Sequence, residues 1–306
     1  MRKILAMVLA VIMVMSMAAC GGNGNETTGS NLSNGSTDTT GSNASNETTG
    51  SAAVPSGVED GVLTVGMECG YAPYNWSQPD DSNGAVPISG TSEYANGYDV
   101  MMAKKLCEAN GWELEIMRLD WDSLVPAVQA GTIDCAIAGQ SMTAERMEKV
   151  DFAGPYLYAS IVCLTKADSA LASATGVSQL AGTCTSQMGT VWYEVCLPQT
   201  PGDIQTPAES APAMLMALET GAVDFVCTDM PTAQGAVVAY PDMVMLDFTG
   251  SEDNFEVSEE EINIGISVMK GNTVLLDAMN SVLSGMTADD FNALMADAIA
   301  VQPIEE

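Results

Sequence analysis

Short apolar runs alternate with amphipathic segments along most of the chain after residue 61. The runs VLTVGME at 62–68 and WELEIMRL at 112–119 are predicted as strands, and the segment between them, GYDVMMAKKLCEANG at 97–111, as a helix that stops at a glycine. The run 123–139 then predicts a helix, a glycine turn and a short strand. Strands that alternate with helices indicate an α/β fold with mainly parallel sheets.

This last unit recurs about ninety residues later along the chain. The segment AMLMALETGAVDFVCTD at 213–229 has the same plan of helix, glycine turn and strand, and Asp229 takes the place of Gly139. Two like units predict two α/β lobes. Because ligands of open α/β sheets bind beyond the carboxyl ends of the strands, we expect Gly139 and Asp229 to face a ligand cleft between the lobes.

The first twenty residues have a different pattern. The positive stretch MRK precedes the apolar run ILAMVLAVIMVMSMAA, which ends at Cys20 and two glycines. The run is short for a membrane-spanning helix, and small residues before a cysteine are typical of a lipoprotein signal. We expect residues 1–19 to be a signal peptide and lipid on Cys20 to hold the protein on the outer face of the cell membrane. An ordinary signal peptide with a chance cysteine is the alternative.

Residues 21–56 consist almost wholly of Gly, Asn, Ser, Thr and a few acids, with NETTGS occurring twice. Such a composition cannot bury enough apolar surface to offset the entropy of ordering. We therefore predict that 20–56 is a lipid-bearing flexible tether that precedes the globular part.

Composition excludes several classes of function. The formal charge is −31, with 9 basic and 40 acidic residues, so the chain lacks the basic face that nucleic acid requires. There is no histidine, which removes Ser-His-Asp triads, Cys-His dyads and histidine-based zinc sites. No metal site and no cofactor is expected.

The eight cysteines contain no C-x-x-C pair, and seven remain if Cys20 is acylated. Several lie in apolar runs, where cysteine behaves as a small hydrophobic residue. We expect mostly free, buried thiols, and a Cys184–Cys227 disulfide is the alternative.

The stretch AGQSMTAER at 138–146 contains one of only three arginines in the chain. Thr143 is a plausible N-cap, which puts Arg146 at the third position of a helix that follows a strand end. The Ser141 hydroxyl and the Arg146 guanidinium could then converge on one anion, since a guanidinium binds a carboxylate through two parallel hydrogen bonds. The alternative is a surface arginine paired with a nearby acid such as Glu148.

With these residues in place, the chain resembles the family-3 solute-binding proteins of ATP-driven amino-acid importers. The resemblance spans roughly 62–270 and rests on the runs LTVGMECGYAPYNW, NGYDVMMAKKLCEANGWELEI, LDWDSLVPAVQAGTIDCAIAGQSMTAERMEKVDFAGPYLYAS, LAGTCTSQMGTVWYE and AVDFVCTDMPTAQGAV. It implies the type II periplasmic-binding-protein fold, in which two α/β lobes joined by a two-strand hinge close on the ligand. The implied division is 57–160 for the first lobe, 161–257 for the second lobe, and 258–306 for the return to the first.

The resemblance also implies a site for an amino-acid zwitterion. Arg146 matches the arginine that holds the ligand α-carboxylate, and Ser141 matches a hydroxyl position beside it. Gly139 matches a main-chain position that receives the α-ammonium, and Asp229 matches the acid on the second lobe that completes the ammonium site. Asp229 would engage fully only on closure.

Three further residues match the family's pocket for the ligand side chain. Tyr71 and Trp121 match aromatic positions that sandwich the side chain, and Glu68 matches an acidic position that faces it. Together they favour a polar or basic side chain, by charge and by cation–π contact, and disfavour glutamate.

The chain departs from the family pattern at two places. Gly189 and Thr190 match the Gly-Thr turn at a helix start in the second lobe, but Val191 stands where a second hydroxyl is common. The segment 75–97 is longer than the usual turn. It could lie over the cleft, with Trp76, Glu93 or Tyr94 contributing, or it could be a surface loop.

We therefore expect a lipid-anchored extracytoplasmic receptor, without enzymatic activity, that binds a free L-amino acid and delivers it as a monomer to the permease subunits of an ABC importer. A surface amino-acid sensor without a transport role is one alternative. A dehydratase related to cyclohexadienyl dehydratase is another, in which Glu68 or Asp229 would serve as the general acid.

Overall fold

The computed structural model describes residues 58–303, which belong to one compact unit, Ser51–Glu306. The predicted signal peptide, the lipid on Cys20 and the tether lie outside the described residues. Within the described part of the chain, no helix is long and apolar enough to cross a membrane.

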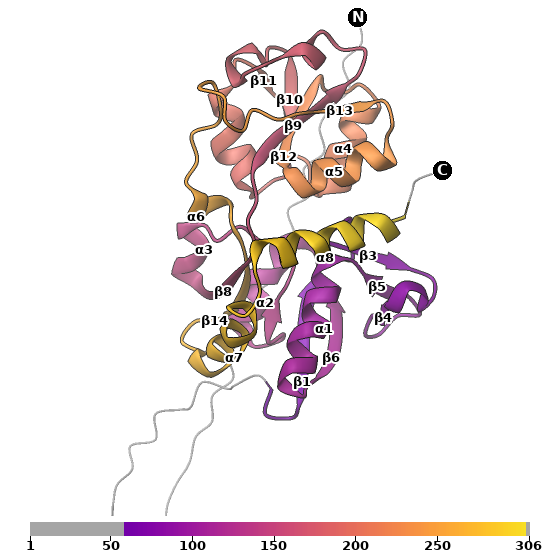
Figure 1. Ribbon diagram of the computed structural model, residues 1–306, viewed down its shortest axis with the longest axis vertical. Helices are drawn as coiled ribbons and strands as arrows, with labels where there is room; N and C mark the ends of the chain where they lie inside the picture. The colour runs from indigo at the N-terminus through magenta and orange to yellow at the C-terminus, as the bar shows by residue number, and fades with distance from the viewer. Residues whose placement is uncertain (1–57, 304–306) are drawn as a thin grey trace, which may run out of the picture. The chain divides into compact units, whose positions relative to one another are not determined.

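A five-stranded sheet forms the first lobe, defined here as residues 58–157 and 264–303 (Figure 1). Strands β1 and β6 pair in parallel, as do β1 and β7, whereas β14 runs antiparallel to both β7 and β8. In sheet order the strands are β6 (Glu113–Arg118), β1 (Val62–Met67), β7 (Cys135–Ala136), β14 (Ile264–Met269) and β8 (Val150–Leu157).

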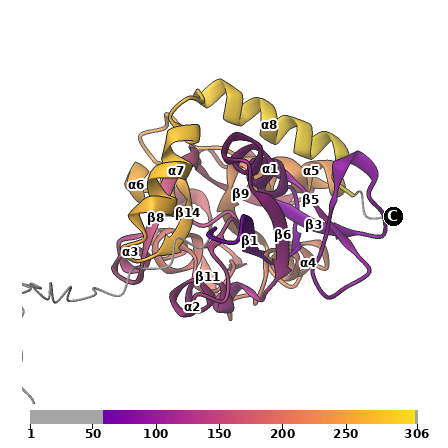
Figure 2. The ribbon, with the colours of Figure 1, turned by 90° about the horizontal axis from the view of Figure 1, so that it is seen from below.

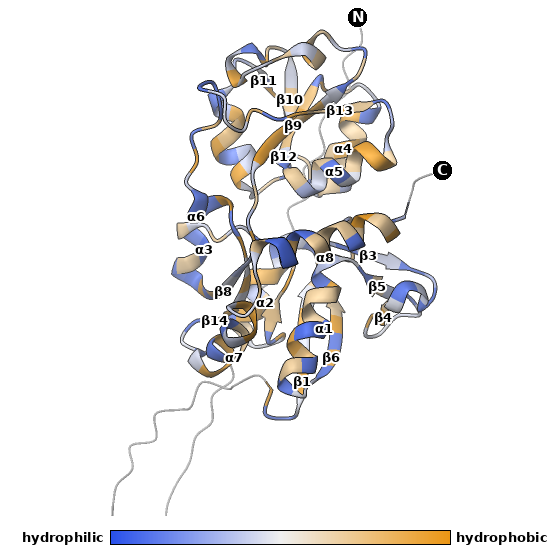
Figure 3. Cartoon of the chain, viewed as in Figure 1, coloured by the Kyte–Doolittle hydropathy of each residue, from blue (hydrophilic) through white to orange (hydrophobic). Residues whose placement is uncertain are grey.

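A second five-stranded sheet forms the second lobe, residues 161–246. Strand β10 pairs in parallel with β11 and β12, and β9 runs antiparallel to β12 and β13. Strand β9 consists mainly of hydrophobic residues, as its orange colour in Figure 3 shows. In sheet order the strands are β11 (Asp203–Ile204), β10 (Thr183–Thr185), β12 (Phe225–Asp229), β9 (Ile161–Lys166) and β13 (Met243–Leu246).

The helices follow from the apolar periodicity of the sequence. Helix α1 buries Val100, Ala103 and Leu106, and it ends where Gly111 adopts a left-handed conformation, with φ of 73°, that favours glycine. Figure 2 shows α8 running past α1 and α7, and α8 also contacts α5 of the second lobe. The helices are α1 (Tyr98–Asn110), α2 (Leu124–Ala130), α3 (Ala144–Lys149), α4 (Ala211–Glu219), α5 (Met230–Ala239), α6 (Glu259–Ile262), α7 (Thr273–Leu283) and α8 (Ala288–Val301).

The long segment 75–97 forms most of a third, antiparallel sheet. Its first strand, β3, pairs with β2, which contains Tyr71, so the segment supports the chain around that tyrosine. Trp76 is buried, and Glu93 forms an ion pair with Arg118 at 2.9 Å. The segment is therefore a small sheet with a partly exposed surface rather than an irregular loop. In sheet order the strands are β2 (Gly70–Tyr71), β3 (Asn75–Gln78), β5 (Tyr94–Asn96) and β4 (Val86–Pro87).

The seven cysteines of the described residues are all free and buried, as predicted. The alternative disulfide between Cys184 and Cys227 is wrong for a geometric reason. Cys184 is in register with Phe225, two residues before Cys227, on the neighbouring strand. Two residues along one strand and one strand across separate the Cα atoms by about 8 Å, beyond the reach of a disulfide.

Thiol titration tests this arrangement. The chain from residue 21 onward should yield seven reactive thiols in denaturant and far fewer when folded, because burial shields the sulfur atoms. The same titration after prior reduction is the control. Two fewer thiols in the unreduced than in the reduced sample would reveal one disulfide and contradict the structure.

Candidate ligand-binding site

The turn after β7 positions Arg146 as the sequence predicted. Thr143 is the N-cap of α3, and its hydroxyl oxygen accepts a hydrogen bond from the Arg146 amide at 3.3 Å. Arg146 is therefore the third residue of α3, the helix that follows β7 along the chain.

The guanidinium of Arg146 links the two lobes. It donates to the Ser141 carbonyl at 2.8 Å and to the Gly189 carbonyl, in the second lobe, at 2.9 Å. Its central carbon lies 5.0 Å from the centre of the Trp121 ring, a cation–π contact. Burial of this group lowers the pKa of Arg146 to about 10. Its partners are thus carbonyls and an aromatic ring rather than Glu148, and the surface-pair alternative is wrong.

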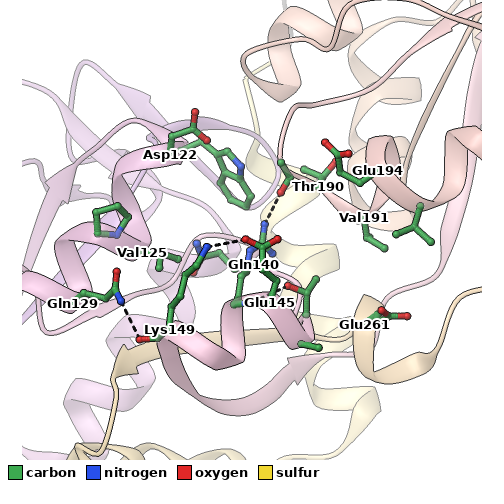
Figure 4. A pocket seen from close by; sticks show the side chains of 17 residues that line it. Asp122, Val125, Gln129, Gln140, Glu145, Lys149, Thr190, Val191, Glu194 and Glu261 are labelled. Atoms are coloured by element: carbon green, nitrogen blue, oxygen red, sulfur yellow. Dashed lines mark hydrogen bonds and ion pairs between the residues drawn. The ribbon is translucent and has the colours of Figure 1, made fainter.

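A cavity of about 650 Å³ adjoins Arg146. Figure 4 shows that side chains of both lobes line it, with Asp122 and Lys149 from the first lobe and Thr190 and Glu194 from the second. Four of the residues predicted for ligand binding lie on its wall, and these are Trp121, Arg146, Gly189 and Thr190. The Thr190 hydroxyl donates to the Gln187 carbonyl at 2.7 Å, which fixes the Gly-Thr turn.

Asp229 lies in a second, fully buried group of residues. It is the N-cap of α5, and its Oδ1 accepts a hydrogen bond from the Thr232 amide at 2.9 Å. Its Oδ2 accepts one from the hydroxyl of Tyr74, in the first lobe, at 2.8 Å. The Tyr71 hydroxyl lies 2.9 Å from the Thr232 hydroxyl, and the two tyrosine rings stack with centroids 4.8 Å apart. Burial raises the pKa of Asp229, and these hydrogen bonds oppose the rise.

Gly139 lies against these tyrosine rings. Its φ of 61° favours glycine, and a Cβ atom there would lie 2.9 Å from the Tyr71 ring and 3.2 Å from the Tyr74 ring. The structure therefore brings Gly139, Tyr71 and Asp229 together, whereas Arg146 and Trp121 line the neighbouring cavity. Of Ser141, the carbonyl rather than the hydroxyl contacts Arg146.

Sequence reasoning missed three residues that support this region. Tyr74 reaches Asp229 across the lobes, and Tyr156 and Asp99 hold the turn at Gly139. The Gly139 amide donates to the Tyr156 hydroxyl at 3.1 Å, which donates to Asp99 at 2.6 Å. Burial raises the pKa of Asp99 to about 7, although hydrogen bonds from Tyr156 and Asn75 oppose it. The only hint in the sequence to these three residues was that each is a tyrosine or an acid at a position where the surrounding pattern is apolar.

Glu68 follows the carboxyl end of β1. Its Oε2 atom is buried and has no hydrogen-bond partner among the described residues. Burial raises the pKa of Glu68 to about 7, and the negative charges of Asp99, Asp120 and Asp122 add to the rise. A donor or a cation placed beside this carboxylate would stabilise its charged form.

Comparison with known proteins identifies the family. Residues 63–297 match the model of the bacterial extracellular solute-binding proteins, family 3, which is most of the chain, so the chain belongs to that family. A probable histidine-binding protein of Neisseria gonorrhoeae is 25% identical over 290 residues, covering 92% of this chain and 90% of that protein.

Solved structures have the same fold. An ancestral arginine-binding protein bound to arginine has a TM-score of 0.60 and 26% identity, covering 77% of this chain and 97% of that one. The ancestral amino acid-binding protein AncCDT-1, a precursor of cyclohexadienyl dehydratase, has a TM-score of 0.60 and 24% identity, covering 79% and 96%. The predicted fold class, the type II periplasmic-binding-protein fold, is confirmed.

The raised pKa of Glu68 predicts how stability depends on pH. A carboxyl group whose pKa is higher in the folded than in the unfolded chain binds more protons when folded, so its contribution to stability is lost as the pH rises from about 4.5 to about 7. Glu68→Gln should therefore flatten the fall in unfolding free energy over this range, measured by urea titration at pH 5 and pH 8. The exposed Glu148→Gln variant is the control, and an equal effect of both variants would contradict the assignment.

Proposed function

We propose that this protein binds a free L-amino acid between its lobes and delivers it to the permease of an ATP-driven importer. The observation that carries the proposal is a pair of opposite charges, one on each lobe: the half-buried Arg146 on the wall of the cavity and the buried Asp229 at the end of β12. Arg146 follows β7 in the first lobe, and Asp229 ends β12 in the second. An amino-acid zwitterion offers the complementary pair of charges.

The α-carboxylate would bind Arg146. The guanidinium now donates to two carbonyls, and an ionised carboxylate is a stronger acceptor than a carbonyl. Ser141 and the Gly189-Thr190 turn would add donors from both sides of the cavity. The α-ammonium would bind the carboxylate of Asp229 and the carbonyl of Gly139.

The ligand side chain would lie among Tyr71, Trp121 and Glu68. Trp121 already packs against one guanidinium, that of Arg146. The buried oxygen of Glu68 needs a donor. These features support a polar or basic side chain. Histidine-binding and arginine-binding relatives are consistent with such a ligand.

The place of action follows from the family and from the first residues of the sequence. Family-3 solute-binding proteins are extracellular by description. We infer that the lipid on Cys20 anchors the protein and that residues 21–56 let the binding domain, residues 57–306, reach the permease. The protein would act as a monomer with the lobes divided at 160/161 and 257/258.

Arg146→Ala tests the carboxylate site. The chain from residue 21 onward, unfolded and refolded to remove bound solute, is melted with each common L-amino acid. At one hundred times its dissociation constant, a ligand should add about 2.7 kcal/mol to the unfolding free energy. Arg146→Ala should abolish this shift, because removing one partner of a desolvated charge pair in a complex typically costs about 2–5 kcal/mol.

Arg118→Ala is the matched control, since Arg118 pairs with Glu93 and does not line the cavity. It should retain the ligand shift of the unchanged protein. Normal binding by Arg146→Ala would place the carboxylate site elsewhere.

Glu68→Gln tests the side-chain pocket. The variant should weaken binding of arginine, lysine or ornithine by about tenfold or more, and binding of glutamine much less, because only a cation uses the carboxylate charge. Calorimetric titration measures both affinities. An equal loss for basic and neutral ligands would remove Glu68 from the pocket.

Two other functions use the same fold. A sensor would bind the amino acid without a transporter, and uptake of labelled ligand by a knockout strain separates the two. A dehydratase has one specific observation in its favour, the raised pKa of Glu68, which suits a general acid near neutral pH. Loss of prephenate on incubation with the protein would support that alternative.

A further inference from the structure

Besides the bond from Arg146 to the Gly189 carbonyl, two contacts between hydroxyl or carboxylate side chains join the two lobes. The Tyr74 hydroxyl of the first lobe donates to the Asp229 carboxylate of the second at 2.8 Å. Beside it, the Tyr71 hydroxyl lies 2.9 Å from the Thr232 hydroxyl. Both contacts reach the N-terminal end of α5, where Asp229 is the N-cap.

These four residues are almost completely removed from water. Tyr71, Tyr74, Asp229 and Thr232 have exposed fractions of 2%, 0%, 1% and 0%. A hydrogen bond to a charged group is stronger than one between neutral groups, and water cannot replace it while the lobes stay packed. The Tyr74–Asp229 bond therefore resists separation of the lobes.

Packing aims both hydroxyl groups at the second lobe. The tyrosine rings stack on each other, and both rings lie against Gly139 in the turn after β7. The ring of Tyr71 also lies 6.5 Å from that of Trp192 in the second lobe. Since the rings are held by these contacts, phenylalanine would keep the packing and remove only the hydroxyl.

We propose that Tyr71 and Tyr74 form a latch that closes the lobes on each other without a bound solute and covers Asp229 until it opens. The closure itself does not depend on the proposed function. Its consequence for binding rests on the proposed function, in which Asp229 receives the ligand ammonium.

The latch sets a condition for entry to the site. Both carboxylate oxygens of Asp229 have donors, the Thr232 amide on Oδ1 and the Tyr74 hydroxyl on Oδ2. The Thr232 bond caps α5 and lies within the second lobe, so the bond that must give way is the one from Tyr74. A solute with an ammonium group replaces that donor, whereas a solute without one leaves the carboxylate short of a partner.

The experiment measures closure directly, on the chain from residue 21 onward after unfolding and refolding to strip any bound solute. Small-angle X-ray scattering gives the radius of gyration of the unchanged protein, Tyr74→Phe, Tyr71→Phe and the double variant. The unchanged protein should be compact. Loss of the bond to the carboxylate should raise the ratio of open to closed molecules about tenfold or more in Tyr74→Phe, with a larger increase in the double variant.

Tyr193→Phe is the matched control, because the Tyr193 hydroxyl donates to the Gln205 carbonyl at 3.0 Å within the second lobe. It removes a comparable hydroxyl without affecting the latch and should stay compact. Circular dichroism melts confirm that each variant folds. If a tyrosine variant fails to fold, Thr232→Val removes the partner of Tyr71 from the opposite side and should likewise increase the open fraction.

Variants as compact as the unchanged protein would overturn the proposal, and so would equal opening of Tyr193→Phe. Both outcomes are measured without any added amino acid. A failed latch is therefore distinguishable from a failed amino-acid site, which the Arg146→Ala melts report.

Discussion

The burial of the Asp229 carboxylate is the constraint on which the rest of the site depends. Asp229 has an exposed fraction of 1%, so its carboxylate needs hydrogen-bond donors from the protein, because water no longer supplies them. The second lobe provides the Thr232 amide at the start of α5, where the helix dipole also favours a negative charge. The first lobe provides the Tyr74 hydroxyl. Neither lobe satisfies this acid alone, so the packing of the lobes and the solvation of one side chain are coupled.

Arg146 is the counterpart of Asp229, and it is held in a similar way. Its guanidinium bonds a carbonyl of its own lobe, a carbonyl of the other lobe and the face of Trp121. Both charged groups therefore rest on neutral partners that belong to the protein. Neutral partners compensate a buried charge only in part, which is why the pKa of Arg146 is lowered and that of Asp229 raised. A molecule that carries both opposite charges compensates both groups more fully.

The large acidic excess of the chain has two physically different parts. Most acids of the described residues are exposed, and their charge favours solubility. Surface ion pairs such as Lys149–Glu145 contribute little to stability. Glu68 and Asp99 differ because burial raises their pKa values to about 7. Asp99 uses its hydrogen bonds to hold Tyr156 and the Gly139 turn, whereas Glu68 keeps a buried oxygen without a partner. The Asp99 carboxylate is thus part of the internal hydrogen-bond network, whereas one oxygen of Glu68 has no partner among the described residues.

The sequence by itself determined the features that depend on near neighbours along the chain. The alternation of apolar runs predicted the α/β fold, the Thr143 cap placed Arg146 in the first turn of α3, and the apolar setting of the cysteines predicted free thiols. The resemblance to the family then indicated which residues were candidates for ligand binding. The tertiary structure decided what depends on residues far apart in sequence: Tyr74 meets Asp229 across 155 positions, and segment 75–97 becomes a sheet because β3 pairs with β2. Local patterns report the face on which a side chain is buried. They do not report which distant partner that burial brings to it, because the partner is fixed only when the two sheets pack.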